Sequence, residues 1–169
     1  MAHYHLLTIW RIQAPLDAVY GAIHNTPRRT GWRPGVMKVE KLAAGDGDGI
    51  NSVLRYVWQG RLPYRMVFEV RATRIEAPQV AIEGAVQGDL EGVGRWRFAH
   101  AGAVSTVRYQ WHVRSTRWWM NLVAPFARTL FIRNHGRLMQ QGAEGLARML
   151  RAPLLSGENI DLKAGVTRV

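Results

Sequence analysis

Apolar and polar residues alternate along most of the first two thirds of the chain, and this period of two is typical of half-buried β-strands. In one stretch, Tyr64 and Phe68 share a face while Arg65 and Glu69 fall on the other. The same pattern predicts seven strands, over residues 3–13, 36–42, 51–59, 64–75, 80–86, 95–98 and 107–114. Turn residues separate neighbouring strands after the second one, which favours an antiparallel sheet.

Helical periodicity appears in three other places. Residues 15–25 carry apolar side chains three and four positions apart, and Pro15 suits the first turn of a helix. Thr26 and Pro27 can cap and begin a second short helix. Residues 125–150 predict one long amphipathic helix, because arginines lie roughly opposite its apolar face. That face consists of Phe131, Leu138, Gly142, Leu146 and Met149.

The order of these elements predicts an α+β fold with two layers. We expect a curved, seven-stranded antiparallel sheet wrapped around the long C-terminal helix, with two short helices after the first strand. A single domain over residues 1–150 accounts for all of these elements. Residues 151–169 show little periodicity, and we expect them to form a loosely ordered tail.

The chain carries a net charge of +11 over 169 residues, mainly from arginine, and it contains no cysteine. Such a charge favours anionic partners, although the basic residues are spread along the chain. The absence of cysteine excludes disulfides and thiolate metal sites. No apolar run is long enough to span a bilayer, and we expect a cytoplasmic protein.

Four short motifs follow one another in this order of elements. They are Ala14-Pro15 with Val19-Tyr20, Trp32-x-Pro34-Gly35-Val36, Gly92-x-Gly94-x-Trp96-x-Phe98, and Arg133-Asn134-His135-x3-Met139-x2-Gly142-x2-Gly145-Leu146. Over about residues 3–150 the chain thereby resembles the helix-grip fold of the START-like superfamily, often called SRPBCC, which includes the polyketide cyclase/dehydrase and lipid-transport group. The resemblance implies a deep, mainly apolar cavity between sheet and long helix that holds lipids, polyketides, hormones or quinones. Most such chains are binders, and some are cyclases or aromatases.

The residues themselves also favour a cavity, because large aromatic side chains crowd the predicted inner face of the sheet. Apolar walls with few polar groups are typical of small-molecule sites, although the same side chains can also fill a core. A cavity of several hundred Å³ would distinguish the two interpretations. The predicted ligand-binding residues are Trp32, Tyr56, Trp58, Tyr64, Phe68, Trp96, Phe98, Tyr109, Trp111, Asn134, His135, Leu138 and Gln141.

Three of these residues are polar and lie beside the apolar face of the long helix: Asn134, His135 and Gln141. They either bond sheet backbone or water at the rim of the core or point into the cavity.

The favoured function is binding of an apolar small molecule in this cavity. The alternative is acid–base catalysis of the cyclase or aromatase type in the same cavity, a lyase or isomerase reaction without metal. His135 is then the candidate for proton transfer.

No nucleophile motif or phosphate-binding loop occurs in the sequence. His3 and His5 share a strand face without an evident third metal ligand, so we expect neither a metal nor a cofactor.

A third hypothesis is a basic surface that binds acidic lipid. The aromatic and apolar stretch Trp118-Trp119-Met120, followed by Leu122-Val123, lies next to arginines. It either contacts a membrane interface, gates the mouth of the cavity or packs at the start of the long helix. Nucleic acid is disfavoured as a partner, because the aromatic residues alternate toward the predicted interior and not along an exposed basic groove.

Overall fold

The computed structural model describes residues 2–25, 35–59, 64–76, 81–122 and 124–162. Its main element is one antiparallel sheet of eight strands in the order β2-β3-β4-β5-β6-β7-β1-β8. The strands are β1 (His3–Ile12), β2 (Val36–Ala43), β3 (Val53–Trp58), β4 (Met66–Glu76), β5 (Ala81–Gly88), β6 (Leu90–Ala101), β7 (Val104–Ser115) and β8 (Leu154–Asp161).

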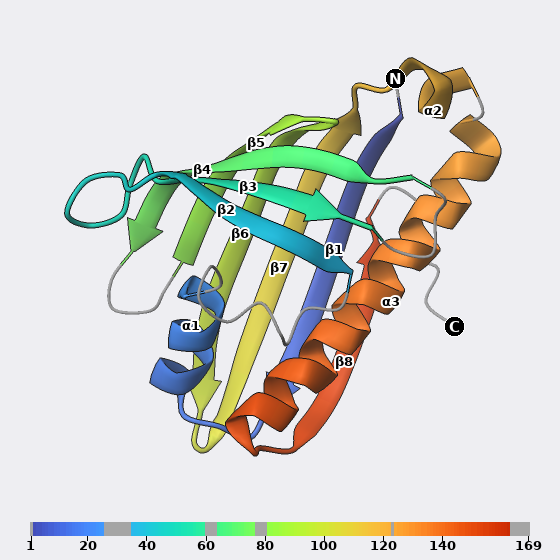
Figure 1. The fold of residues 1–169 in the computed structure, drawn as a ribbon. Coiled ribbons are helices and arrows are strands. Elements are labelled where there is room, and N and C mark those ends of the chain that lie inside the picture. Colours follow the sequence, from blue (N-terminus) through green and yellow to red (C-terminus); the bar gives the residue numbers. More distant parts are fainter. Residues whose placement is uncertain (1, 26–34, 60–63, 77–80, 123, 163–169) are drawn as a thin grey trace.

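Three helices accompany the sheet in the described part of the chain: α1 (Leu16–His24), α2 (Trp118–Leu122) and α3 (Ala124–Leu150). The sheet curves strongly, and α3 runs across its open side (Figure 1). The long helix predicted over 125–150 is confirmed to within one residue at its start. The predicted second short helix, from Thr26, lies outside the described residues. None of the described helices is long and apolar enough to cross a membrane.

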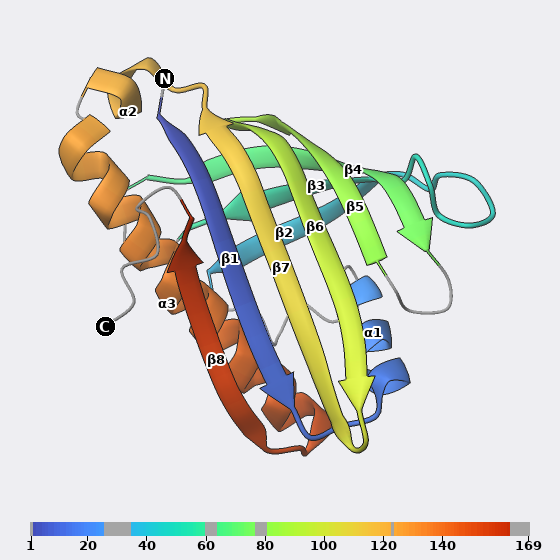
Figure 2. The same cartoon turned by 180° about the vertical axis from the view of Figure 1, so that it is seen from behind.

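The sheet has one strand more than predicted, because β8 forms within the segment expected to be a loose tail. It pairs with β1 from Leu6 opposite Asp161 to Ile12 opposite Leu154. The Thr8 hydroxyl donates to Asn159 Oδ1 at 2.7 Å, and Asn159 Nδ2 donates to a backbone carbonyl of α3. The view from behind shows β8 between β1 and α3 (Figure 2). Contacts distant in sequence therefore stabilise this strand, and its own periodicity does not reveal them.

Strand β6 is also longer than predicted. The glycines over residues 88–94 predict a turn or a bulge, yet residues 90–94 belong to the strand. The turn lies at Gly88, whose φ of 129° favours glycine.

Alternation along the strands places two groups of buried side chains on the inner face of the sheet. One group packs under α1 and the C-terminal half of α3, where Leu146 is fully buried. The other packs under the N-terminal half of α3, around Phe131. The helix thus covers the sheet at two places, and Leu138 lies between them.

Candidate functional site

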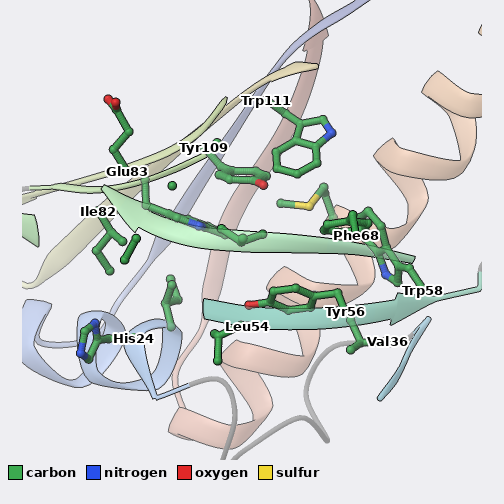
Figure 3. Close-up of a pocket in the computed structure, with 18 of the residues that line it drawn as sticks. His24, Val36, Leu54, Tyr56, Trp58, Phe68, Ile82, Glu83, Tyr109 and Trp111 are labelled. Carbon is green, nitrogen blue, oxygen red and sulfur yellow. The ribbon is translucent and has the colours of Figure 1, made fainter. Parts of the chain in front are cut away.

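A cavity of about 170 Å³ lies between the curved sheet, α1 and the middle of α3. Most strands contribute to its wall, since alternate residues of each strand point to the same side. The lining residues are Trp10, Ile23, His24, Val36, Ser52, Leu54, Tyr56, Trp58, Phe68, Val70, Ala72, Ile75, Ile82, Glu83, Gly84, Gly94, Trp96, Tyr109, Trp111, Leu138, Met139 and Gly142 (Figure 3). The cavity is smaller than predicted and smaller than the roughly 300–1,000 Å³ of drug-sized sites. Its size suits a compact molecule better than a long-chain lipid.

Aromatic rings form a continuous series along the cavity wall. Trp96 and Tyr109 stack with ring centroids 4.0 Å apart, and Trp111 follows 5.5 Å from Tyr109. Phe68 lies 5.9 Å from Trp111 and stacks on Tyr56 at 5.5 Å with an interplanar angle of 17°. Rings at these distances attract one another and offer flat apolar surfaces to a ligand. The series therefore suits a planar ring system.

Two glycines that face each other across β5 and β6 shape this wall. A Cβ at Gly94 would lie 2.9 Å from Trp111 Cζ3 and 3.2 Å from Tyr109 Oη. A Cβ at Gly84 would lie 2.5 Å from a methyl group of Val70. Side chains of the neighbouring strands occupy the space that these glycines leave. Glycine is required here for close approach and not for an unusual backbone angle.

Few polar groups reach the cavity among the described lining residues. Tyr56 and Tyr109 contribute hydroxyls from different walls, and His24 lies at the end of α1 (Figure 3). Glu83 is the one described lining residue with a carboxylate, and its side chain points away from the cavity and pairs with Arg95. The site is thus apolar, with hydroxyl groups as its main hydrogen-bonding partners.

No group of histidine, cysteine or acidic residues that could hold a metal occurs among the residues that the structure describes. The prediction of neither metal nor cofactor stays a prediction.

Seven of the thirteen predicted ligand-binding residues line the cavity. They are Tyr56, Trp58, Phe68, Trp96, Tyr109, Trp111 and Leu138. Trp32 lies outside the described residues.

The structure does not bring the other five into the cavity. Tyr64 packs against Trp119 of α2, with ring centroids 4.6 Å apart. Phe98 is buried in the core and meets Tyr20 edge to face. The polar side chains of the long helix, Asn134 and Gln141, are half-buried outside the lining.

His135 lies behind the aromatic wall and is 3% exposed. It lies between Trp58 and Phe131, with ring centroids 6.4 and 6.5 Å away, and its Nε2 has no hydrogen-bond partner among the described residues. Burial lowers the pKa of His135 to about 4, so the ring is neutral at pH 7. A sealed, neutral imidazole is poorly placed for proton transfer to a molecule in the cavity.

Several lining residues that share the strand phase of the predicted aromatic residues were not predicted as ligand-binding. Leu54 precedes Tyr56 by two residues, and Ile82 precedes Gly84 by two. Period-two alternation could have identified them, because every second residue of a strand faces the same side. His24 gave no such signal, since it ends a short helix.

Solved structures with the same fold share little sequence with this chain. TTHA0849 from Thermus thermophilus is 17% identical, with a TM-score of 0.67 over 86% of this chain and 98% of that chain. The Zhui aromatase/cyclase from Streptomyces sp. R1128 is 15% identical, with a TM-score of 0.69 over 88% and 94%. The di-domain aromatase/cyclase BexL from the BE-7585A biosynthetic pathway is 17% identical, with a TM-score of 0.66 over 90% of this chain and 51% of that chain. No curated protein matches the sequence.

These neighbours show the fold. The predicted likeness to the SRPBCC superfamily is confirmed by a family-model match. A family model described as polyketide cyclase / dehydrase and lipid transport matches residues 9–151, which is most of the chain. The match runs from the last part of β1 to the end of α3 and thus includes the described residues that line the cavity. The chain belongs to the polyketide cyclase / dehydrase and lipid transport family.

Proposed function

We propose that the protein binds one compact, planar, mainly apolar molecule in the cavity under α3. The observation that carries this proposal is the series of adjacent rings from Trp96 to Tyr56, stacked in pairs at its two ends and tilted at Trp111, around a space of about 170 Å³. Flat aromatic walls favour a ring system by offset stacking. The Tyr56 and Tyr109 hydroxyls can hydrogen-bond a carbonyl or hydroxyl group on such a ring.

Aromatic polyketides and quinones combine these features, and two structural neighbours support the first class by their names. Zhui is an aromatase/cyclase, and BexL is an aromatase/cyclase of a biosynthetic pathway. A long acyl chain fits less well, because it needs a longer cavity than this one.

Binding is favoured over catalysis. Acid–base catalysis needs a group that gives or takes a proton within hydrogen-bond reach of the bound molecule. The His135 ring is sealed behind the wall, and the Glu83 carboxylate is turned outward. Among the described lining residues, the Ser52, Tyr56 and Tyr109 hydroxyls and the exposed His24 remain, and no described carboxylate faces the cavity beside them.

Isothermal titration calorimetry of the full chain with fluorenone, and with stearate as comparator, tests the proposal. Leu54→Trp fills the cavity from β3, whereas Met37→Trp adds the same side chain at a position that is 56% exposed. We expect one fluorenone per chain in the wild type and in Met37→Trp, weaker stearate binding, and a loss of at least about tenfold in Leu54→Trp. Equal binding by both variants, or no binding by the wild type, would contradict the proposal.

A further inference from the structure

Exposed apolar side chains gather around α2, away from the cavity. Trp118 and Leu122 are each 75% exposed, and their i,i+4 spacing puts them on one face of the helix. Leu130, early in α3, is 53% exposed. Val67, whose backbone N–H and the Arg117 side chain bind the same Asp89 oxygen, is 39% exposed. These four belong to only seven exposed large apolar residues in the described part of the chain, and such clustering marks an interaction surface.

The exposure of Trp118 results from a well-anchored helix. Arg117 Nη2 donates to Asp89 Oδ2 at 2.7 Å, and the same carboxylate oxygen accepts the backbone N–H of Val67. The Thr116 hydroxyl donates to a carbonyl at the β5–β6 turn at 2.7 Å. The next residue, Trp119, packs edge to face against Tyr64. With Trp119 turned inward and the start of the helix fixed, Trp118 is presented to solvent.

The same segment is strongly basic. Residues 115–143 contain four arginines and no aspartate or glutamate. Arg117 and Arg128 form ion pairs with Asp89 and Asp161. The exposed Arg133 and Arg137 form no ion pair with a described carboxylate, and they lie one and two turns after Leu130 on α3. Apolar side chains beside unpaired cations complement an acidic surface with an apolar interior.

We propose that α2 and the exposed face of early α3 dock on a bilayer that contains anionic phospholipid. The Trp118 and Leu122 side chains enter the headgroup region, where the amphipathic indole ring is favoured. Arg133 and Arg137 interact with the lipid phosphates. The net charge of +11 adds attraction to an acidic membrane at longer range. Such docking would place the protein where apolar molecules partition.

Flotation of the full chain with two vesicle preparations tests the docking surface. One preparation is pure phosphatidylcholine, and the other contains about one third phosphatidylglycerol. We expect binding to the acidic vesicles that weakens with salt, and little binding to the neutral ones. The double variant Trp118→Ser/Leu122→Ser should bind acidic vesicles at least about tenfold more weakly. Arg133→Gln/Arg137→Gln should also bind more weakly and lose part of the salt dependence.

A matched control removes exposed apolar residues elsewhere. Met37 and Leu155 are 56% and 51% exposed, and the variant Met37→Ser/Leu155→Ser should float like the wild type. An unchanged thermal transition shows that each variant is folded.

The proposal is overturned if the wild-type protein does not float with acidic vesicles. The proposal is also overturned if the Trp118→Ser/Leu122→Ser variant binds acidic vesicles as tightly as the wild type. General charge attraction would then explain the binding without these two side chains. A dimer that disappears in this variant, without vesicle binding by the wild type, would assign the surface to a second copy of the chain.

Discussion

Trp96 of β6 and Tyr109 of β7 are direct cross-strand partners, and their rings stack with centroids 4.0 Å apart and an interplanar angle of 22°. The pair has two roles. It joins the two strands, and such a contact contributes about 0.5–1.5 kcal/mol beyond burial. It also forms part of the cavity wall, so one contact stabilises the sheet and shapes the site.

The residue that lets the Trp111 and Tyr109 side chains lie close to β6 is Gly94, the cross-strand partner of Trp111. In Gly94→Ala, the new Cβ would meet Trp111 Cζ3 at 2.9 Å and Tyr109 Oη at 3.2 Å, so the Trp111 ring must shift and the Tyr109 hydroxyl must give by a few tenths of an ångström. We expect fluorenone affinity to fall about tenfold and the free energy of unfolding to fall by about 1–3 kcal/mol. Calorimetric titration and urea unfolding measure the two effects. Gly47→Ala is the control, because its Cβ would meet nothing within 4 Å. Unchanged affinity in Gly94→Ala would show that the rings do not shape the site.

The buried His135 ring makes stability depend on pH. Its pKa is lowered from 6.5 to about 4 by burial. The contribution of neutral His135 to the free energy of unfolding is fully present above pH 6.5. It is lost as the pH falls toward 4, because His135 in the unfolded chain takes up a proton at a higher pH than in the folded chain. Between pH 7 and pH 5 we expect wild-type protein to lose about 2 kcal/mol more than His135→Phe does. Urea unfolding at the two pH values measures this difference. An equal loss in both proteins would mean that His135 titrates normally in the fold.

The Tyr4 hydroxyl tests whether a buried polar atom is tolerated without a partner. Tyr4 is fully buried, packs on Phe131 at 4.0 Å, and has no hydrogen-bond partner for its hydroxyl among the described residues. Burial raises the pKa of Tyr4 to about 12. Since Tyr4→Phe removes an unsatisfied group and keeps the ring, we expect stability to be unchanged or higher by about 1 kcal/mol. A loss above that size in urea unfolding would reveal a partner for the hydroxyl.

A buried hydrogen bond between side chains adds to the backbone pairing of β8 with β1. Thr8 is 1% exposed, and its hydroxyl donates to Asn159. Asn159→Ala leaves that buried hydroxyl without an acceptor, and we expect a loss of about 1–3 kcal/mol in the free energy of unfolding. The variant Thr8→Val/Asn159→Ala removes both polar partners and should recover part of the loss. If the single and double variants are equally unstable, the hydrogen bond does not couple the two strands.

Periodicity predicted most of the sheet and the long helix, because burial of one face imposes a local pattern. The alternation around Phe68 and the helical spacing from Phe131 to Leu146 are such patterns. Strand β8 was not predicted, since Pro153 and Gly157 interrupt any local pattern and its partners are β1 and α3. The five-residue helix α2 is too short for a periodic signal.

The cavity wall was predicted in part for the same reason. Strand phase identifies the inner face, which is why Tyr56 and Trp111 were assigned and do line the cavity. The position of a residue in the strand or helix period does not show whether other side chains separate it from the cavity. His135 has a suitable helical position, yet Trp58 packs against it from the sheet side. Tyr64 also has the right phase, but it lies at the end of the sheet where α2 covers it.

The central claim, that the aromatic-walled cavity holds a planar ring, can be tested by NMR of the full chain with labelled methionine methyl groups. The chain has six methionines, and Met139 lines the cavity whereas Met37 is 56% exposed on β2. On titration with fluorenone we predict that the Met139 signal shifts by ring current and saturates at one equivalent, while the Met37 signal stays in place. A titration that moves Met37 and leaves Met139 unchanged, or that moves neither, would contradict the account.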